Sequence, residues 1–84
     1  MAEVIMYSTG YCPYCMKARD LLQQKKVTFK EIRVDSQPEL REEMVIKSGR
    51  HTVPQIFINS HHVGGCDDLY ALEDQGKLDQ LLGE

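Results

Sequence analysis

The chain has 84 residues, a length that fits one small domain over residues 1–84. Its 42% hydrophobic and 27% charged residues are ordinary for a globular protein, and no apolar run is long enough to cross a bilayer. The net charge of −3 and the lack of a basic run argue against nucleic-acid binding. The chain does not open with a basic and then apolar leader, so we expect a cytoplasmic protein.

The first half of the chain is expected to alternate strands with helices. A continuous apolar run predicts a buried strand over residues 3–8, and a proline at the first turn then suits a helix over residues 13–24. A second strand is expected over residues 28–34. Ser36 begins a pattern that fits a capping box for the next helix, and Gly49 suits its end.

The second half is expected to contain a hairpin followed by two helices. Residues 55–59 form a strong strand pattern, and after a turn residues 61–63 suit a short returning strand. A helix then begins near Gly65 and stops near Gly76, and leucines around Leu78 suggest a final short helix. A strand–helix–strand unit favours a parallel pair, and the hairpin adds an antiparallel one. The order strand–helix–strand–helix–strand–strand–helix–helix therefore predicts an α/β fold with a four-stranded mixed sheet flanked by helices.

Two of the three cysteines lie at Cys-x-x-Cys spacing, where the first strand meets the first helix. Cys12 is expected at the helix start, where unpaired N–H groups and the helix dipole stabilise a thiolate. Cys15 lies three residues later on the same helix face and can reach it. With the Cys12 sulfur exposed and the Cys15 sulfur tucked into the first turn, we predict a nucleophile at Cys12 and a resolving thiol at Cys15.

Two other interpretations of this pair are less favoured. Both cysteines can be small buried hydrophobic residues, although their placement around a proline at a strand–helix junction argues against this. A zinc site needs two further ligands in tetrahedral geometry, and its remaining candidates are Cys66, His51, His61 and His62. No second Cys-x-x-Cys or spaced histidine pair is present, so no metal is expected.

Three segments together resemble the glutaredoxin family: Cys-Pro-Tyr-Cys at residues 12–15, Thr-Val-Pro at 52–54 and Gly-Gly-Cys-Asp-Asp-Leu at 64–69. The resemblance covers essentially the whole chain and is greatest to the short bacterial dithiol glutaredoxins of the third type. It implies a thioredoxin fold and an enzyme that reduces protein disulfides and glutathione mixed disulfides. Glutathione is then the electron donor, no cofactor is tightly bound, and the partners of the expected monomer are disulfide-containing or glutathionylated proteins.

The resemblance also implies residues that bind glutathione. Tyr14 corresponds to a tyrosine that packs on the tripeptide, and Arg41 lies where relatives often hold the glycyl carboxylate. The family proline that corresponds to Pro54 is cis, and together with Thr52 it presents the Val53 backbone for pairing with an extended peptide.

The glycine-rich segment is expected to bind the other end of the tripeptide. Gly65 allows close backbone approach, and the resemblance assigns the γ-glutamyl carboxylate to the backbone at Cys66 and Asp67. The Asp67 side chain then lies near the amino group. The chain departs from many relatives at Thr9, where they carry a lysine three residues before the first catalytic cysteine.

Two rival functions are considered, one of them enzymatic and the other, a non-enzymatic carrier, from another class. A thioredoxin-like redoxin reduced by a flavoprotein reductase is disfavoured by Tyr14 and the segment at residues 64–69. An iron–sulfur carrier that holds a cluster between two subunits is disfavoured by Pro13 and Cys15, because such relatives usually have one active-site cysteine followed by Gly-Phe-Ser.

Overall fold

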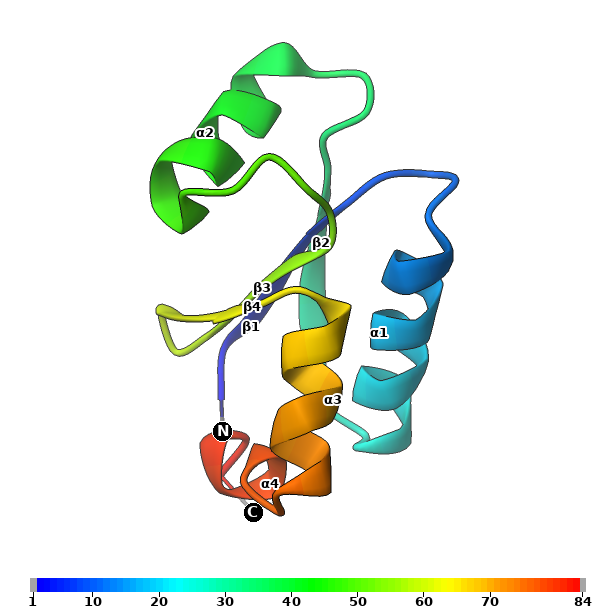
Figure 1. Cartoon of the computed structure of the whole chain (residues 1–84), viewed down its shortest axis with the longest axis vertical. Helices are drawn as coiled ribbons and strands as arrows, with labels where there is room; N and C mark the ends of the chain where they lie inside the picture. The colour runs from blue at the N-terminus through cyan, green and yellow to red at the C-terminus, as the bar shows by residue number, and fades with distance from the viewer. Residues whose placement is uncertain (1, 84) are drawn as a thin grey trace.

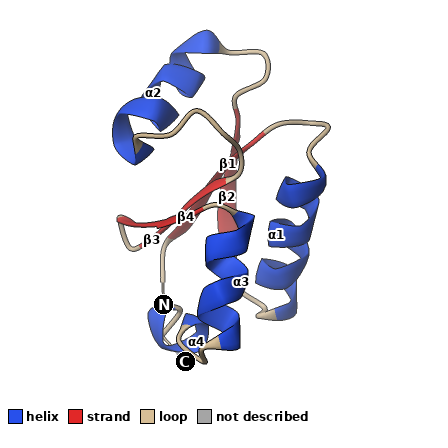
Figure 2. Ribbon diagram, in the orientation of Figure 1, coloured by secondary structure: helices blue, strands red, loops and turns tan. Residues whose placement is uncertain are grey.

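The computed structural model describes residues 2–83, which form a four-stranded sheet with helices on both faces (Figures 1 and 2). The strands are β1 (Val4–Ser8), β2 (Phe29–Arg33), β3 (Gln55–Ile58) and β4 (His61–Gly64). The helices are α1 (Pro13–Gln24), α2 (Pro38–Ser48), α3 (Cys66–Asp74) and α4 (Leu78–Leu81). The predicted α/β order and mixed sheet are confirmed, with element ends that differ from the prediction by one or two residues.

The sheet has the strand order β2-β1-β3-β4. β1 pairs in parallel with β2, with Val4 opposite Phe29, and antiparallel with β3, with Val4 opposite Ile58. β3 and β4 form the antiparallel hairpin, closed by Asn59 and Ser60, which both have positive φ. The carboxyl end of β1 therefore lies beside the start of β3, which brings the first cysteine segment next to residues 52–54.

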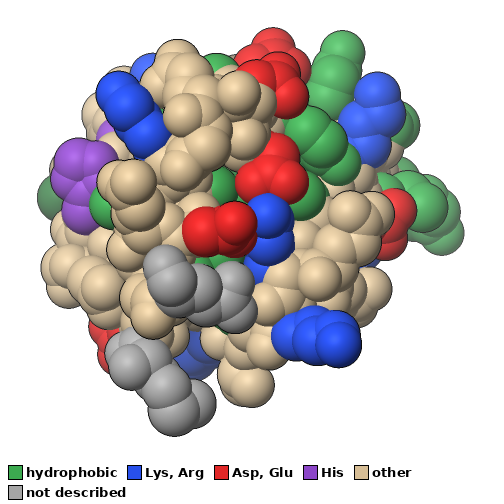
Figure 3. Space-filling view, turned by 90° about the horizontal axis from the view of Figure 1, so that it is seen from below, with side chains coloured by type: hydrophobic (Ala, Val, Ile, Leu, Met, Phe, Trp, Pro, Cys, Tyr) green, Lys and Arg blue, Asp and Glu red, His purple; other side chains and the backbone are tan. Residues whose placement is uncertain are grey.

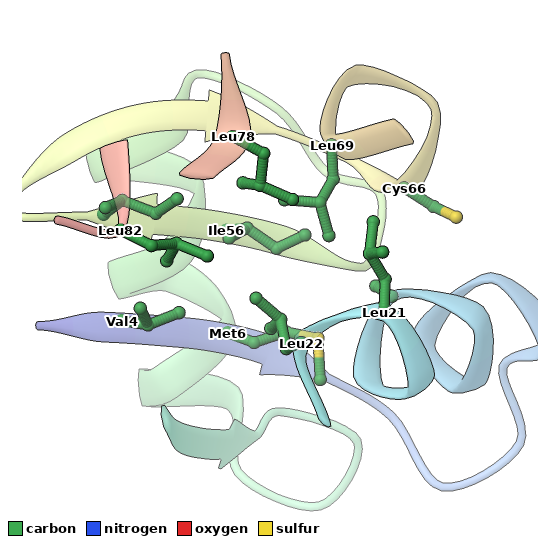
Figure 4. Close-up of a cluster of buried hydrophobic side chains, with 11 residues drawn as sticks. Val4, Met6, Leu21, Leu22, Ile56, Cys66, Leu69, Leu78 and Leu82 are labelled. Carbon is green, nitrogen blue, oxygen red and sulfur yellow. The ribbon is translucent and has the colours of Figure 1, made fainter. Parts of the chain in front are cut away.

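The larger hydrophobic core fills the space between the sheet and helices α1, α3 and α4 (Figure 4). Its side chains come from every element around that space: Val4, Met6, Ala18, Leu21, Leu22, Ile56, Ile58, Cys66, Leu69, Leu78 and Leu82. Burial of this apolar surface is the main favourable term in folding. Because α1 supplies Ala18, Leu21 and Leu22, the helix that carries the cysteine pair is packed firmly against the sheet.

A smaller hydrophobic cluster attaches α2 to the other face of the sheet (Figure 1). Its buried members are Tyr7, Val34, Met44 and Phe57, and Met44 is the one buried side chain that α2 contributes. Ile46 on the same helix is 76% exposed. The layer formed by α2 is therefore thinner than the opposite layer.

The ends of α2 test the two capping expectations. Gly49 ends the helix in the left-handed conformation, with φ of 72°, and its N–H donates to the Val45 carbonyl, as predicted. The capping box at Ser36 is wrong, because Gln37 precedes the first helical residue and makes no side-chain capping bond. Pro38 occupies the first turn, and its missing N–H reduces the need for such a cap.

The end of the molecule that carries α4 displays acidic and basic side chains side by side (Figure 3). Lys25, at the end of α1, pairs with Glu73 at 2.7 Å and with Asp79 at 2.9 Å, which ties α1 to both C-terminal helices.

None of the helices among the described residues has the length and apolar character needed to cross a membrane.

We predict that Met44→Ala lowers the free energy of unfolding by about 2–5 kcal/mol, because it leaves a cavity where α2 meets the sheet. Ile46→Ala is the matched control on the same helix and should change stability by less than about 0.5 kcal/mol. Urea unfolding followed by circular dichroism measures both variants. Equal losses for the two would show that Met44 does not anchor α2.

Candidate functional site

The Cys-x-x-Cys pair lies at the start of α1, as the sequence predicts. Pro13 occupies the first turn, and Cys12 has extended backbone angles with φ of −136° and ψ of 104°. The Cys12 Sγ accepts a hydrogen bond from the Cys15 backbone N–H at 3.1 Å, so the sulfur itself caps the helix. This N–H donor and the positive end of the helix dipole both stabilise negative charge on the Cys12 sulfur.

The two sulfurs differ in their surroundings. Cys15 is 0% exposed, whereas Cys12 is 8% exposed, so Cys12 is more shielded than the sequence analysis expected but is still the more accessible of the two. Burial and then the hydrogen bond to Cys12 raise the pKa of the Cys15 thiol to about 12, although the Thr9 backbone and Arg19 act in the opposite direction. At neutral pH Cys15 therefore keeps its proton.

A cavity of about 300 Å³ opens beside the cysteine pair. Its walls come from three separate segments and consist of Tyr14, Arg50, Thr52, Val53, Pro54, Gly65, Cys66, Asp67 and Asp68. The Cys12 thiol donates to the Val53 carbonyl at a distance of 3.8 Å, so the Cys12 sulfur contacts a residue of the cavity wall. The Val53–Pro54 peptide bond is cis, as the resemblance implies.

Most of the expected binding residues meet at this cavity, with one exception. Tyr14, Thr52, Val53, Pro54, Gly65, Cys66 and Asp67 all line it. Arg41 does not, because its guanidinium donates to the His51 carbonyl at 3.1 Å. The sequence analysis missed two charged residues in the lining, Arg50 and Asp68. Arg50 lies two residues before the Thr-Val-Pro segment, and this proximity is the feature of the sequence that could have identified it as a cavity residue.

Arg50 and Asp68 join two walls of the cavity. The Asp68 carboxylate accepts the Gly65 N–H at 2.9 Å and the Arg50 guanidinium at 3.1 Å. The Gly65 N–H and then Arg50 lower the pKa of Asp68, so its carboxylate stays charged at neutral pH. In this part of the cavity, Arg50 and the N–H groups at the N-terminus of α3 are donors that suit a ligand carboxylate, and they lie beside the carboxylates of Asp67 and Asp68.

Cys66 lies both on the cavity wall and at the edge of the main hydrophobic core (Figure 4). Burial and then the nearby charge of Asp67 raise the pKa of its thiol. A thiol kept neutral in this way is a weak nucleophile. The environment of Cys66 therefore suits packing rather than sulfur chemistry.

A polar group ties the second turn of α1 to the sheet. Arg19 donates through Nε and Nη2 to both oxygens of Glu31, and the buried Ser8 hydroxyl donates to the same carboxylate. These contacts fasten α1 to β1 and β2 one helical turn after Cys15. Among residues 2–83, no group of three or more His, Cys, Asp or Glu side chains is arranged to hold a metal ion.

A helix-capping cysteine, a buried partner thiol and an adjoining cavity define a thiol–disulfide oxidoreductase. The profile of the glutaredoxin family matches residues 4–63. The chain is 58% identical over 82 residues to a glutaredoxin of Pseudomonas aeruginosa, covering 98% of both chains. It is 55% identical to glutaredoxin 3 of Escherichia coli, covering 98% of this chain and 99% of that one.

Structural similarity extends to more distant members. A crystal structure of a buckwheat glutaredoxin–glutathione complex is 28% identical, with a TM-score of 0.89 over 96% of this chain and 76% of that one. The chain therefore belongs to the glutaredoxin family, has the thioredoxin fold and is an enzyme of disulfide exchange. The family resemblance inferred from the three sequence segments is confirmed.

We predict that Asp68→Ala lowers the free energy of unfolding by about 0.5–1 kcal/mol at pH 7, because it uncaps α3. The folded state lowers the pKa of Asp68, so its contribution is present above the unfolded value of about 3.9 and disappears as the pH falls through the folded value. Urea titrations at pH 7 and pH 2.5 measure this difference. Asp67→Ala is the control, and a loss that persists at pH 2.5 contradicts the assignment.

Proposed function

We propose that this glutaredoxin reduces protein disulfides and glutathione mixed disulfides with glutathione as electron donor, using Cys12 as nucleophile and Cys15 as resolving thiol. The observation that carries the proposal is the contact of the Cys12 sulfur with Val53, on the wall of a cavity that also contains the start of α3. A free peptide backbone and a carboxylate-binding helix end thus lie within reach of one reactive sulfur. We further propose that the protein works as a cytoplasmic monomer without a tightly bound cofactor.

The cavity suits each part of a tripeptide that carries two carboxylates. The Val53 backbone pairs with the extended peptide, as an added strand pairs with a sheet edge. The N–H groups of Cys66 and Asp67 at the helix start bind the γ-glutamyl carboxylate, with the Asp67 side chain near the amino group. Tyr14, which is 57% exposed, packs on the peptide. The buckwheat relative that was solved with glutathione supports glutathione as the ligand of this cavity.

Two arginines are available for the ligand's carboxylates. Arg50 lines the cavity and is held at the start of α3 by Asp68, whereas Arg41 donates to the carbonyl of His51, one residue before Thr52. We assign Arg50 to the carboxylate at the α3 end of the cavity and retain Arg41, which supports the same loop, as a weaker contributor for the glycyl carboxylate. An arginine suits this role because its planar fork matches a carboxylate.

The first half-reaction oxidises the enzyme and reduces the substrate. The Cys12 thiolate attacks one sulfur of a protein disulfide, a Cys12–substrate disulfide forms, and the departing substrate thiolate takes a proton from water. Cys15 then gives up its proton and attacks Cys12, which releases the second substrate thiol and leaves a Cys12–Cys15 disulfide. A glutathionylated substrate needs only Cys12, because its thiol leaves directly and glutathione stays on Cys12.

The second half-reaction reduces the enzyme again with electrons from glutathione. One glutathione thiolate attacks the Cys12 sulfur, so that a Cys12–glutathione disulfide forms and Cys15 regains its proton. A second glutathione thiolate attacks the sulfur of the bound glutathione, which releases oxidised glutathione and the Cys12 thiolate. Two glutathione molecules thus supply the two electrons, and no other reductant is required.

We predict that Cys12→Ser abolishes the reduction of both substrate types, because it removes the attacking sulfur. Cys15→Ser should keep most of the activity on a glutathione mixed disulfide and lose most of the activity on protein disulfides. A coupled assay with glutathione reductase measures both reactions, with circular dichroism as the control for folding. Appreciable turnover by Cys12→Ser would refute the assignment, and absent turnover by the unmodified protein would refute the use of glutathione.

We predict that Arg50→Ala and Asp67→Ala raise KM for the glutathione mixed disulfide by about 3- to 10-fold while kcat changes less, because both groups act in binding. Arg41→Ala should have a smaller effect, because the side chain lies outside the cavity lining. Lys30→Ala, which removes an exposed charge on β2, is the charge-matched control. The pocket assignment fails if KM stays at the unmodified value in folded Arg50→Ala and Asp67→Ala.

A further inference from the structure

A buried amide lies directly behind the loop that faces Cys12. Gln55, the first residue of β3, is 0% exposed. Its Nε2 donates to the Thr52 carbonyl at 3.0 Å and to the Thr52 Oγ1 at 3.3 Å, and its Oε1 lies 2.7 Å from the His62 Nε2. Every polar atom of this side chain is therefore engaged, on one side by the loop and on the other by β4.

The hydrogen-bond pattern determines the position of one proton. The Thr52 carbonyl only accepts, so the NH₂ end of Gln55 must face Thr52 and its oxygen must face His62. The His62 Nε2 must then carry the proton and donate it. Burial and then the charge of Arg50 lower the pKa of His62, with His61 acting in the same direction and Asp68 in the opposite one. The ring is therefore neutral at pH 7, with its single proton on Nε2.

Neighbouring residues hold the His62 ring in place. Phe57 is paired with His62 across the hairpin, and the two ring centroids are 5.0 Å apart at an interplanar angle of 36°. His61, the preceding residue on the same strand, is exposed and takes no part in these contacts. The ring thus has a fixed orientation, and its N–H is aimed at Gln55.

The contacts continue to the reactive sulfur. Thr52, which the amide holds, directly precedes Val53, whose carbonyl accepts the Cys12 thiol at 3.8 Å. We propose that Gln55 and His62 are positioning residues for disulfide exchange: the His62 N–H orients the Gln55 amide, and the amide holds the Thr52–Val53 backbone at the distance from Cys12 that the bound substrate requires. Neither side chain touches the reacting sulfurs. The expected effect on glutathione substrates rests on the function proposed above.

This proposal differs from a purely structural role in what it predicts for kinetics. If the pair only filled the interior, its loss would lower stability and leave the kinetic constants of the folded enzyme unchanged. If it positions the loop, its loss lets the Val53 backbone move, so the pairing surface for the peptide is less well ordered. Binding should then weaken more than turnover.

Three substitutions test the chain of contacts. Gln55→Met keeps the side-chain length and removes all three hydrogen bonds. His62→Phe keeps an aromatic ring packed against Phe57 and removes the N–H donor. Each should raise KM for a glutathione mixed disulfide by about tenfold, the change that corresponds to loss of one buried hydrogen bond, while kcat stays within about twofold. His62→Gln restores a donor near the position of Nε2 and should recover most of the loss.

His61→Phe is the matched control, because it makes the same chemical change one residue away on the same strand. It should leave KM within twofold of the unmodified enzyme. The proposal is overturned if KM is unchanged in folded Gln55→Met and His62→Phe, or if His61→Phe has the same effect as His62→Phe.

Two further measurements do not depend on glutathione. In the unmodified protein, nitrogen-15 NMR of the histidine rings should show His62 protonated on Nε2, and a proton on Nδ1 would overturn the assignment even if no variant folds. Alkylation of Cys12 by iodoacetamide at pH 7 should quicken at least twofold in His62→Phe, because a mobile Val53 carbonyl no longer engages the thiol. Unchanged alkylation counts against the positioning role, whereas failure of the unmodified enzyme to use glutathione counts only against the proposed function.

Discussion

The hydrogen bond from the Cys15 N–H to the Cys12 sulfur is the contact on which the rest of the site depends. It makes the Cys12 side chain part of the helix terminus, so that the sulfur satisfies one of the N–H donors that a helix start leaves unpaired. The same turn buries Cys15, and burial keeps that thiol protonated, with a pKa of about 12. One local arrangement therefore distinguishes two chemically identical side chains: the first accepts a backbone hydrogen bond at the helix start, and the second is buried as a neutral thiol.

The topology of the sheet explains why a ligand cavity adjoins this turn. β1 lies next to β3, so the loop that leaves β1 toward α1 meets the loop that enters β3. β4 lies on the other side of β3 and leads directly into α3, which brings a second helix start to the same end of the sheet. Three segments that are far apart in the chain thus line one cavity, and the Cys12 sulfur contacts the Val53 carbonyl on its wall.

The structural features that the sequence predicts correctly are those determined by a few neighbouring residues. The proline at the start of α1, Gly49 at the end of α2 and the Asn59–Ser60 turn each act within a few residues, and each is found as expected. The capping box at Ser36 failed because the residue before a proline favours an extended conformation, so that Gln37 rather than Ser36 directly precedes the helix. Spacing along the chain places Arg50 near the Thr-Val-Pro segment, but it does not show which way a long side chain points. The sequence analysis therefore selected Arg41 and passed over Arg50, and it assigned no role to His62, whose partner Gln55 lies on a neighbouring strand.

The two faces of the sheet hold the two halves of the site with unequal strength. Cys12 and Cys15 begin a helix that is anchored in the larger hydrophobic core, whereas residues 50–54 follow α2, whose single buried side chain is Met44. In this loop Val53 packs against the smaller hydrophobic cluster. Polar contacts hold the residues around it: Arg41 on the His51 carbonyl, Arg50 on Asp68, and Gln55 on Thr52. Hydrogen bonds are directional where apolar contacts are not, so they suit a backbone segment whose distance from one sulfur atom matters. The hydrophobic core thus fixes the nucleophile, and a small set of polar side chains fixes the surface that is proposed to receive its substrate.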